Sequence, residues 1–345
     1  MSENGTSKRS WGWLWPMLPP LLPALAAVLV LEFLNAPGFS LDHVIERLPA
    51  GVKDDEIFVR HMGARMNYAA VVLLHIFVCL CAIFYFGIRL GESPRLLRRR
   101  ASVAIVLESV SVLGALVCLS YWDFGDNQPL GAYKLTYFNI RTLFEKIPAS
   151  HDLVKQGYLW GVSKLSFSVV AAIAFGVFAV LMAAGVASVA VSTLSEVSEE
   201  KWLGCVRDQI QVLQQSFFLL SAVLVTSTLT ATMLFYLPTE TLEPHIKAVV
   251  IDPLSSYARG LAVFWGVIFT LILAAVFAPP AVILRQRIRR FAQRRDRVET
   301  ASEFREWLKR LELTVSLEKQ LGNVAVLIAP LLTGPIASLL QKLGG

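Results

Sequence analysis

Residues 66–88 read MNYAAVVLLHIFVCLCAIFYFGI and contain no aspartate, glutamate, lysine or arginine. A membrane-spanning helix needs about 20 consecutive apolar residues, because each residue advances the helix by about 1.5 Å across a hydrocarbon layer of about 30 Å. A surface helix of a soluble protein would alternate apolar and polar faces, whereas this stretch is apolar almost all round. It therefore predicts a helix that crosses a membrane.

Five further apolar stretches of similar length lie before and after this one. Apolar residues make up 55% of the 345-residue chain and charged residues only 17%, which is too little charge to cover a soluble protein of this size. We predict an all-α polytopic membrane protein with about six transmembrane helices, structured outer loops and a C-terminal cytoplasmic helical tail. Residues 1–284 form the predicted bundle and residues 285–345 the tail, with spans near 15–34, 66–88, 101–122, 167–191, 212–236 and 260–284.

The distribution of basic residues predicts how the bundle is oriented. If the N-terminus is inside, the inner segments are the N-terminus, 89–100, 196–208 and 285–319, and they hold 20 lysines and arginines against 11 in the longer outer segments. Short cytoplasmic segments carry such an excess of positive charge. We therefore place the N-terminus and 285–319 in the cytoplasm and the bundle in the plasma membrane, taken as a bacterial inner membrane.

Several classes of function lack support in this sequence. The net charge of +6 arises at the ends of apolar runs, so we expect no nucleic-acid partner. Phosphate-binding, dinucleotide-binding, zinc-protease and serine-hydrolase motifs are absent from the sequence, so we expect no cofactor and favour a non-enzymatic protein. Cys79 and Cys81 lie two residues apart on a helix and point to different faces, which argues against a shared metal or redox site.

Glu108 and His75 are ionisable residues inside predicted spans. Such residues are costly in a membrane and are candidate functional sites for that reason. We expect His75 near the outer end of the second helix and Glu108 near the inner end of the third, so that they do not form a pair. Glu108 has a structural alternative, which is an ion pair with an inner arginine such as Arg98 or Arg99.

The fifth predicted helix is rich in hydroxyl side chains, among them Thr228 and Thr232. Hydroxyls can line an aqueous path, but serine and threonine also bond back to carbonyls of their own helix. The fourth helix carries a stripe of small residues that allows close helix approach, within this chain or with a second copy. The members of this stripe are Ala172, Gly176, Ala179, Ala183 and Ala187.

Pro279 and Pro280 lie near the inner end of the sixth predicted helix. Because proline removes a helical hydrogen bond, the pair predicts either a hinge that couples the tail to the bundle or a static kink. Arginines at the inner ends of the spans are candidate contacts for anionic lipid headgroups, although they also serve as a topology signal. The candidates for headgroup contact are Arg98, Arg99, Arg289 and Arg290.

The tail predicts a short amphipathic helix. Thr300 and Glu303 have the spacing of a capping box, in which each side chain bonds the other residue's backbone N–H. Phe304, Leu308, Leu311 and Val315 then form an apolar seam. This helix could pack on the chain's own inner face, associate with a second copy through 300–319, or dock a protein partner.

Other segments carry weaker predictions. We expect a short amphipathic helix at 40–48, two short helices within 123–164 and a more extended loop at 238–259. The apolar segment 323–341 contains two prolines, so a broken hairpin or an interfacial segment is favoured over a seventh span.

Two functions of different classes follow from these features. The first is a non-enzymatic sensor, scaffold or effector that acts through its outer loops and cytoplasmic tail. The alternative is an oligomeric channel or transport component, with the hydroxyl-rich fifth helix lining the path. We expect the lipid bilayer to be a partner in either case.

Overall fold

The computed structural model describes residues 21–33, 54–121, 162–193, 199–242, 248–296, 298 and 300–311. In these ranges the chain forms seven helices and no strand. The all-helical fold predicted from the sequence is therefore confirmed for this part of the chain. The helices are α1 (Leu21–Phe33), α3 (Asp54–Gly91), α4 (Arg95–Tyr121), α8 (Val162–Thr193), α9 (Glu199–Leu242), α10 (Ala248–Asp296) and α11 (Ala301–Arg310).

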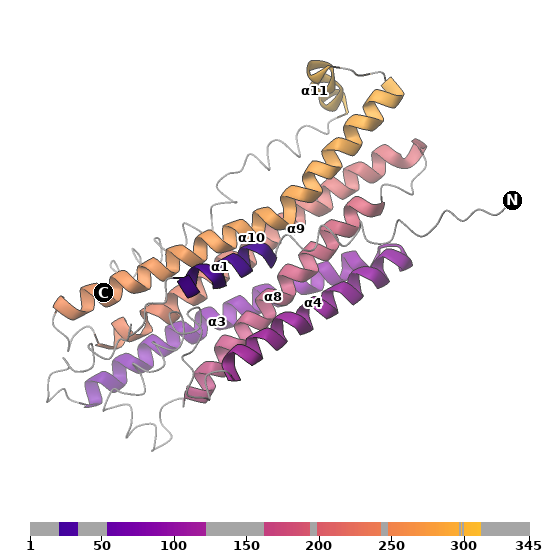
Figure 1. Ribbon diagram of the computed structural model, residues 1–345. Coiled ribbons are helices and arrows are strands. Elements are labelled where there is room, and N and C mark those ends of the chain that lie inside the picture. The colour runs from indigo at the N-terminus through magenta and orange to yellow at the C-terminus, as the bar shows by residue number, and fades with distance from the viewer. Residues whose placement is uncertain are drawn as a thin grey trace.

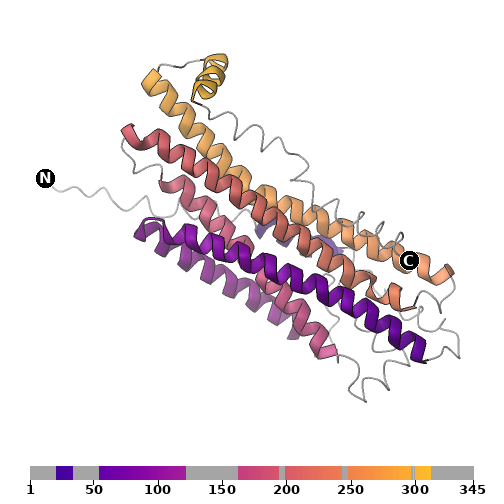
Figure 2. The same cartoon turned by 180° about the vertical axis from the view of Figure 1, so that it is seen from behind.

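The bundle is elongated and consists of α3, α4, α8, α9 and α10, which run side by side (Figure 1). The C-terminal ends of α3, α8 and α10 and the N-terminal ends of α4 and α9 share one end of the bundle, as the view from behind also shows (Figure 2). The described parts of the predicted inner segments 89–100, 196–208 and 285–319 therefore lie at a common end. The short α1 packs along α10.

Four described helices are long and apolar enough to cross a membrane, over Met62–Gly91, Ser168–Ser192, Lys201–Leu237 and Ser255–Asp296. They contain the second, fourth, fifth and sixth predicted spans. The first predicted span corresponds to α1, which is shorter, and the third to α4. The protein is therefore helical with four candidate spans in its described part, while the count of six and the orientation stay predictions.

Helix α8 is the centre of the bundle because it packs against α3, α4, α9 and α10. Every residue from Leu181 to Val191 is buried. The predicted stripe of small residues explains this position, since Ala179, Ala183 and Ala187 are fully buried and let neighbouring helices approach closely. This stripe is thus used for packing within the chain.

The outer faces of α3 and α4 expose large apolar side chains. Phe77 and Phe84 are 64% and 73% exposed, and Leu107 on α4 is 62% exposed. A surface of this size and character in water would favour association or precipitation, whereas acyl chains solvate it well. These faces indicate contact with a lipid bilayer.

Cys81 is exposed on α3 while Cys79 is buried, which confirms that they point to different faces.

Two predicted loops are helical in the structure. Helix α9 begins at Glu199, so most of the predicted inner loop 196–208 belongs to it, and α10 begins at Ala248, within the segment expected to be extended. Tertiary packing explains both extensions, because Trp202 at the start of α9 and Ala258 in α10 are buried against other helices. The prediction of an extended loop at 238–259 is wrong outside residues 243–247, which the structure does not describe.

Helix α10 continues through Pro279 and Pro280 without a break. The helix is bent in both views (Figures 1 and 2). Proline is the usual cause of a kink, because its ring crowds the preceding turn and its nitrogen cannot donate. The proline pair thus does not end the helix, and its action as a hinge or as a static kink stays a prediction.

Three sequence predictions lie outside the described residues. They are the helix at 40–48, the two helices within 123–164, of which only the first residues of α8 are described, and the segment 323–341.

Candidate functional site

A helical extension stands at the end of the bundle where the basic segments meet. We call it the arm, and it consists of residues 199–212 of α9, residues 285–296 of α10, and α11. Helices α9 and α10 reach past the turn between α3 and α4, and α11 folds beside the end of α10 (Figures 1 and 2). Helix α10 has 49 residues and is therefore about 73 Å long, more than twice the hydrocarbon thickness of a bilayer.

Aromatic packing holds the arm together. The rings of Trp202 on α9 and Phe291 on α10 are stacked, with centroids 3.9 Å apart and planes 10° apart. On α11, the Trp307 indole N–H donates to the Asp296 carboxylate at the end of α10. Arg207 on α9 donates to the carbonyl oxygen of Leu311 at 3.3 Å. These contacts make α9, α10 and α11 one packed unit.

The capping box predicted at the start of α11 is confirmed. The Glu303 N–H donates to Thr300 Oγ1 at 3.2 Å, and the Thr300 N–H donates to Glu303 Oε2 at 3.3 Å. The predicted seam was incomplete, since Trp307 is also buried, beside Phe304. A tryptophan three residues after a seam phenylalanine was the available signal. Val315 lies outside the described residues.

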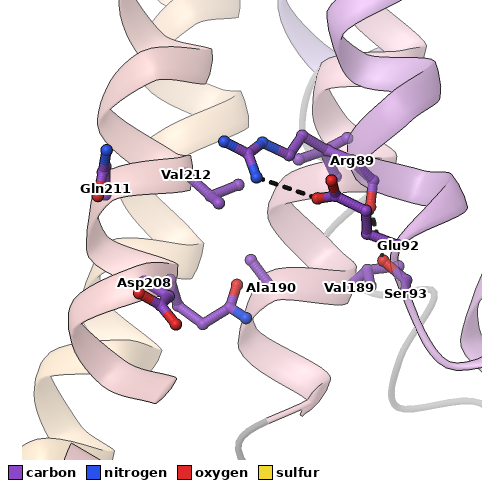
Figure 3. A pocket seen from close by; sticks show the side chains of 10 residues that line it. Arg89, Glu92, Ser93, Val189, Ala190, Asp208, Gln211 and Val212 are labelled. Carbon is purple, nitrogen blue, oxygen red and sulfur yellow. Dashed lines mark hydrogen bonds and ion pairs between the residues drawn. The ribbon is translucent and has the colours of Figure 1, made fainter. Parts of the chain in front are cut away.

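A cavity of about 270 Å³ lies at the root of the arm, between the end of α3, α8 and α9. Its floor is formed by α8, through Val186, Val189 and Ala190. Figure 3 shows the Arg89 guanidinium pointing from α3 toward α9, with Asp208 and Gln211 on the facing helix. The remaining lining residues are Glu92, Ser93, Gln209 and Val212.

Hydrogen bonds fix the position of Arg89 in the cavity wall. Its Nη1 lies 3.0 Å from Glu92 Oε2, while its Nε donates to Tyr85 Oη at 3.3 Å. Its Nη2 donates to Gln215 Oε1, also at 3.3 Å, and the Tyr85 hydroxyl donates to the same oxygen at 2.7 Å. This network joins α3 to α9 at the basic end of the bundle.

The same stretch of α9 forms a wall of the cavity and a side of the arm. Asp208 and Gln211 line the cavity, while Trp202 and Arg207 contact α10 and α11. Arg287 adds a second link, because its guanidinium donates to the carbonyl of Val191 at the end of α8. Carbonyls at a helix C-terminus lack partners in their own helix, so this arginine satisfies one of them. The cavity wall and the arm therefore share residues 202–212 of α9.

His75 lies in the middle of its candidate span, 13 residues after Met62 and 16 before Gly91. The expectation that it lies near the outer end was wrong, because α3 continues as a helix well before residue 66. The imidazole is 2% exposed and joins three helices. Its Nδ1 lies 2.9 Å from Thr226 Oγ1 on α9, and its Nε2 lies 3.2 Å from the Ala172 carbonyl on α8.

Two of the hydrogen-bond partners of His75, Ala172 and Thr226, indicate which ring nitrogen carries the proton. A backbone carbonyl only accepts, so Nε2 carries the hydrogen that bonds Ala172. In the neutral imidazole Nδ1 is then an acceptor, and the Thr226 hydroxyl is its donor. That hydroxyl also lies 2.9 Å from the Val223 carbonyl of its own helix, so it has an alternative acceptor. The geometry is that of a satisfied polar contact between helices.

The hydroxyl residues predicted as candidates on α9 are buried inside the bundle. Thr228 and Thr232 are fully buried, and their hydroxyls donate to carbonyls four residues earlier, at 2.9 and 2.8 Å. This is the back-bonding that serine and threonine commonly make in helices. It supports a packing role for both, and leaves their role in a transport path a prediction.

Glu108 is half-buried on α4, and its Oε2 has no hydrogen-bond partner among the described residues. Arg98, its expected partner, instead donates from Nη1 to the Gly91 carbonyl at 2.9 Å and so caps the end of α3. The expected pair with Arg98 is therefore not formed. Arg99, Arg289 and Arg290 are exposed, as lipid contacts require.

The chain was compared with known protein families, with curated proteins and with solved structures. This chain matches none of them. Its function is therefore inferred from its own residues.

The contacts of Arg89 and Arg287 were not predicted from the sequence. Polar residues at the ends of apolar runs were an available signal for both.

Proposed function

We propose that this protein is a non-enzymatic multi-pass membrane sensor whose arm acts as the effector that docks a cytoplasmic protein partner. The observation that supports it is the double use of α9, in which one short stretch lines the cavity with Asp208 and holds the arm with Trp202. A cavity occupant that moves this stretch changes the arm, because packed helices shift as units.

The charge of the arm supports its role as a docking surface. The C-terminal part of α10 exposes several arginines, and the arm's end of the bundle is the one predicted to be cytoplasmic. The outermost residues of this surface lie about 15 Å beyond the innermost along the helix, so the surface is longer than a lipid headgroup layer is thick. An acidic protein surface complements it. The exposed arginines are Arg285, Arg289, Arg290, Arg294 and Arg295.

A photo-reactive side chain tests the docking role in living cells. Placed at Arg305, which is exposed on α11, it is expected to give a discrete protein adduct. Trp307→Ala removes the contact that holds α11 on α10, so it should abolish that adduct while membrane insertion is retained. The same group at Phe77 on the outer face of α3 serves as the control and should label lipid. An adduct at Arg305 that persists in Trp307→Ala would count against the proposal.

The channel remains the alternative function, with α9 as the pore-lining helix. Its support is the number of hydroxyls on α9, although several of them donate to carbonyls of their own helix, namely those of Ser227, Thr228, Thr230 and Thr232. Ion flux into liposomes that hold the purified full-length protein tests it. A protein-dependent flux that Thr228→Leu or Thr232→Leu reduces, with assembly unchanged, would favour the channel over the sensor.

A further inference from the structure

We propose that the cavity at the root of the arm binds a primary ammonium group, carried by the headgroup of an aminophospholipid or by a free amine. This inference rests on the proposed function only in treating the cavity as the sensor's input. The binding itself is argued from the charges, hydrogen-bonding groups, size and depth of the cavity.

The charges of the cavity favour a cation. Arg89, Glu92 and Asp208 are its charged lining residues, and they leave one net negative charge. Arg89 is engaged by Glu92, Tyr85 and Gln215, so its charge is offset within the wall. Asp208 lies on the facing helix (Figure 3). Because Glu92 is paired with Arg89, Asp208 supplies the carboxylate that a cation between the two walls meets.

The hydrogen-bonding groups favour a cation with N–H donors. An ammonium group has three donors and no acceptor, and carboxylate oxygens bond it strongly. Ser93 donates its own hydrogen to the Arg89 carbonyl at 2.9 Å, so its hydroxyl oxygen is left as an acceptor at the rim. Gln211 adds an amide oxygen. The ten lining residues include no aromatic ring, which is the usual partner of a quaternary ammonium.

The size and depth of the cavity limit the ligand. A volume of about 270 Å³ equals that of roughly nine waters and lies below the range of sites for drug-sized ligands. Arg89 lies two residues before the end of the candidate span Met62–Gly91, at the depth expected for lipid headgroups. A headgroup with an ethanolamine moiety fits both limits, and so does a small free amine.

Thermal unfolding of the purified full-length protein in detergent, followed by tryptophan fluorescence, tests the inference. The probes are short-chain phosphatidylethanolamine, short-chain phosphatidylcholine and free ethanolamine. At ten times its Kd, phosphatidylethanolamine should raise Tm by about 2 °C, whereas phosphatidylcholine, which has no N–H donor, should not. Asp208 is exposed, and Asp208→Asn keeps the shape of its side chain. This change should raise the Kd for phosphatidylethanolamine about tenfold and so reduce the rise in Tm at the same lipid concentration. Glu306→Gln, a matched change on α11 away from the cavity, should respond like the wild type.

The outcomes of these measurements either support ammonium binding and identify its source, or overturn it. An equal shift with free ethanolamine supports the inference with a free amine as the source, and a shift with the lipid alone supports it with the headgroup as the source. Equal shifts with both lipids, no shift with any probe, or an undiminished response of Asp208→Asn would overturn it. Cross-linking at Arg305 is measured separately, so failure of ammonium binding and failure of partner docking are distinguishable.

Discussion

His75 Nδ1 lies 2.9 Å from Thr226 Oγ1, and this contact ties α3 to α9 at the centre of the bundle. The second ring nitrogen reaches the Ala172 carbonyl on α8, so one side chain connects three helices. A polar side chain at this depth has few alternative partners, because acyl chains offer no hydrogen bonds. The three-helix contact therefore helps to select which faces of α3, α8 and α9 meet.

The first prediction concerns this contact. His75→Ala leaves a void and removes both hydrogen bonds, so we expect it to lower the free energy of unfolding by about 2–4 kcal/mol. Thr226→Val keeps the shape and removes one interhelical bond, at a cost of about 0.6–1.5 kcal/mol. Unfolding of the purified protein by denaturing detergent measures both. If the double variant equals the sum of the two single variants, the residues are not coupled.

A second prediction concerns the attachment of α11. Trp307→Ala removes a buried indole and its bond to Asp296, and should destabilise the docking of α11 by about 3 kcal/mol. Faster proteolysis near residues 297–300 and faster hydrogen exchange in α11 would report this, with the transmembrane helices unaffected. Arg305→Ala, an exposed change on the same helix, is the control. Unchanged exchange in Trp307→Ala would contradict the packed arm.

The buried threonines of α9 give a third prediction. Thr228→Val and Thr232→Val remove hydroxyls that bond only their own helix, so each should change stability by less than about 1 kcal/mol. We expect liposome permeability to be the same with and without these changes. A protein-dependent leak that either variant abolishes would instead place these side chains in a transport path.

Orientation provides the fourth prediction. A cysteine introduced at Arg294, in a variant that lacks the four native cysteines, should react with a membrane-impermeant maleimide only when the cytoplasmic face is accessible. Inside-out vesicles and intact cells supply the two conditions. Labelling in intact cells would reverse the orientation and with it the cytoplasmic role of the arm.

The sequence predicted those features that depend on one helix at a time. The apolar run 66–88, the different faces of Cys79 and Cys81, and the capping box at Thr300 each arise from local spacing, and each is present in the structure. The contacts of His75 and Arg89 were not predicted. They depend on which helices are neighbours and at what register, and apolar periodicity carries no such information.

The lengths of the helices were predicted wrongly for a related reason. Residues 199–208 look polar enough for a loop, yet Trp202 and Val206 are buried against neighbouring helices, so packing keeps them helical. Tertiary packing also explains why the contact of Arg287 was not predicted. This residue caps α8 at the carbonyl of Val191, which is 96 residues away in the chain.

The burial of residues 181–191 of α8 has a consequence for biosynthesis. Residues 181–191 contact helices on all sides in the finished bundle, but α9 and α10 leave the ribosome after α8. Until they arrive, these residues face lipid, and their apolar character makes that state stable. Assembly then exchanges acyl chains for helix surfaces of similar polarity, so close contact between small residues, rather than escape from water, favours the packing of α9 and α10 on α8.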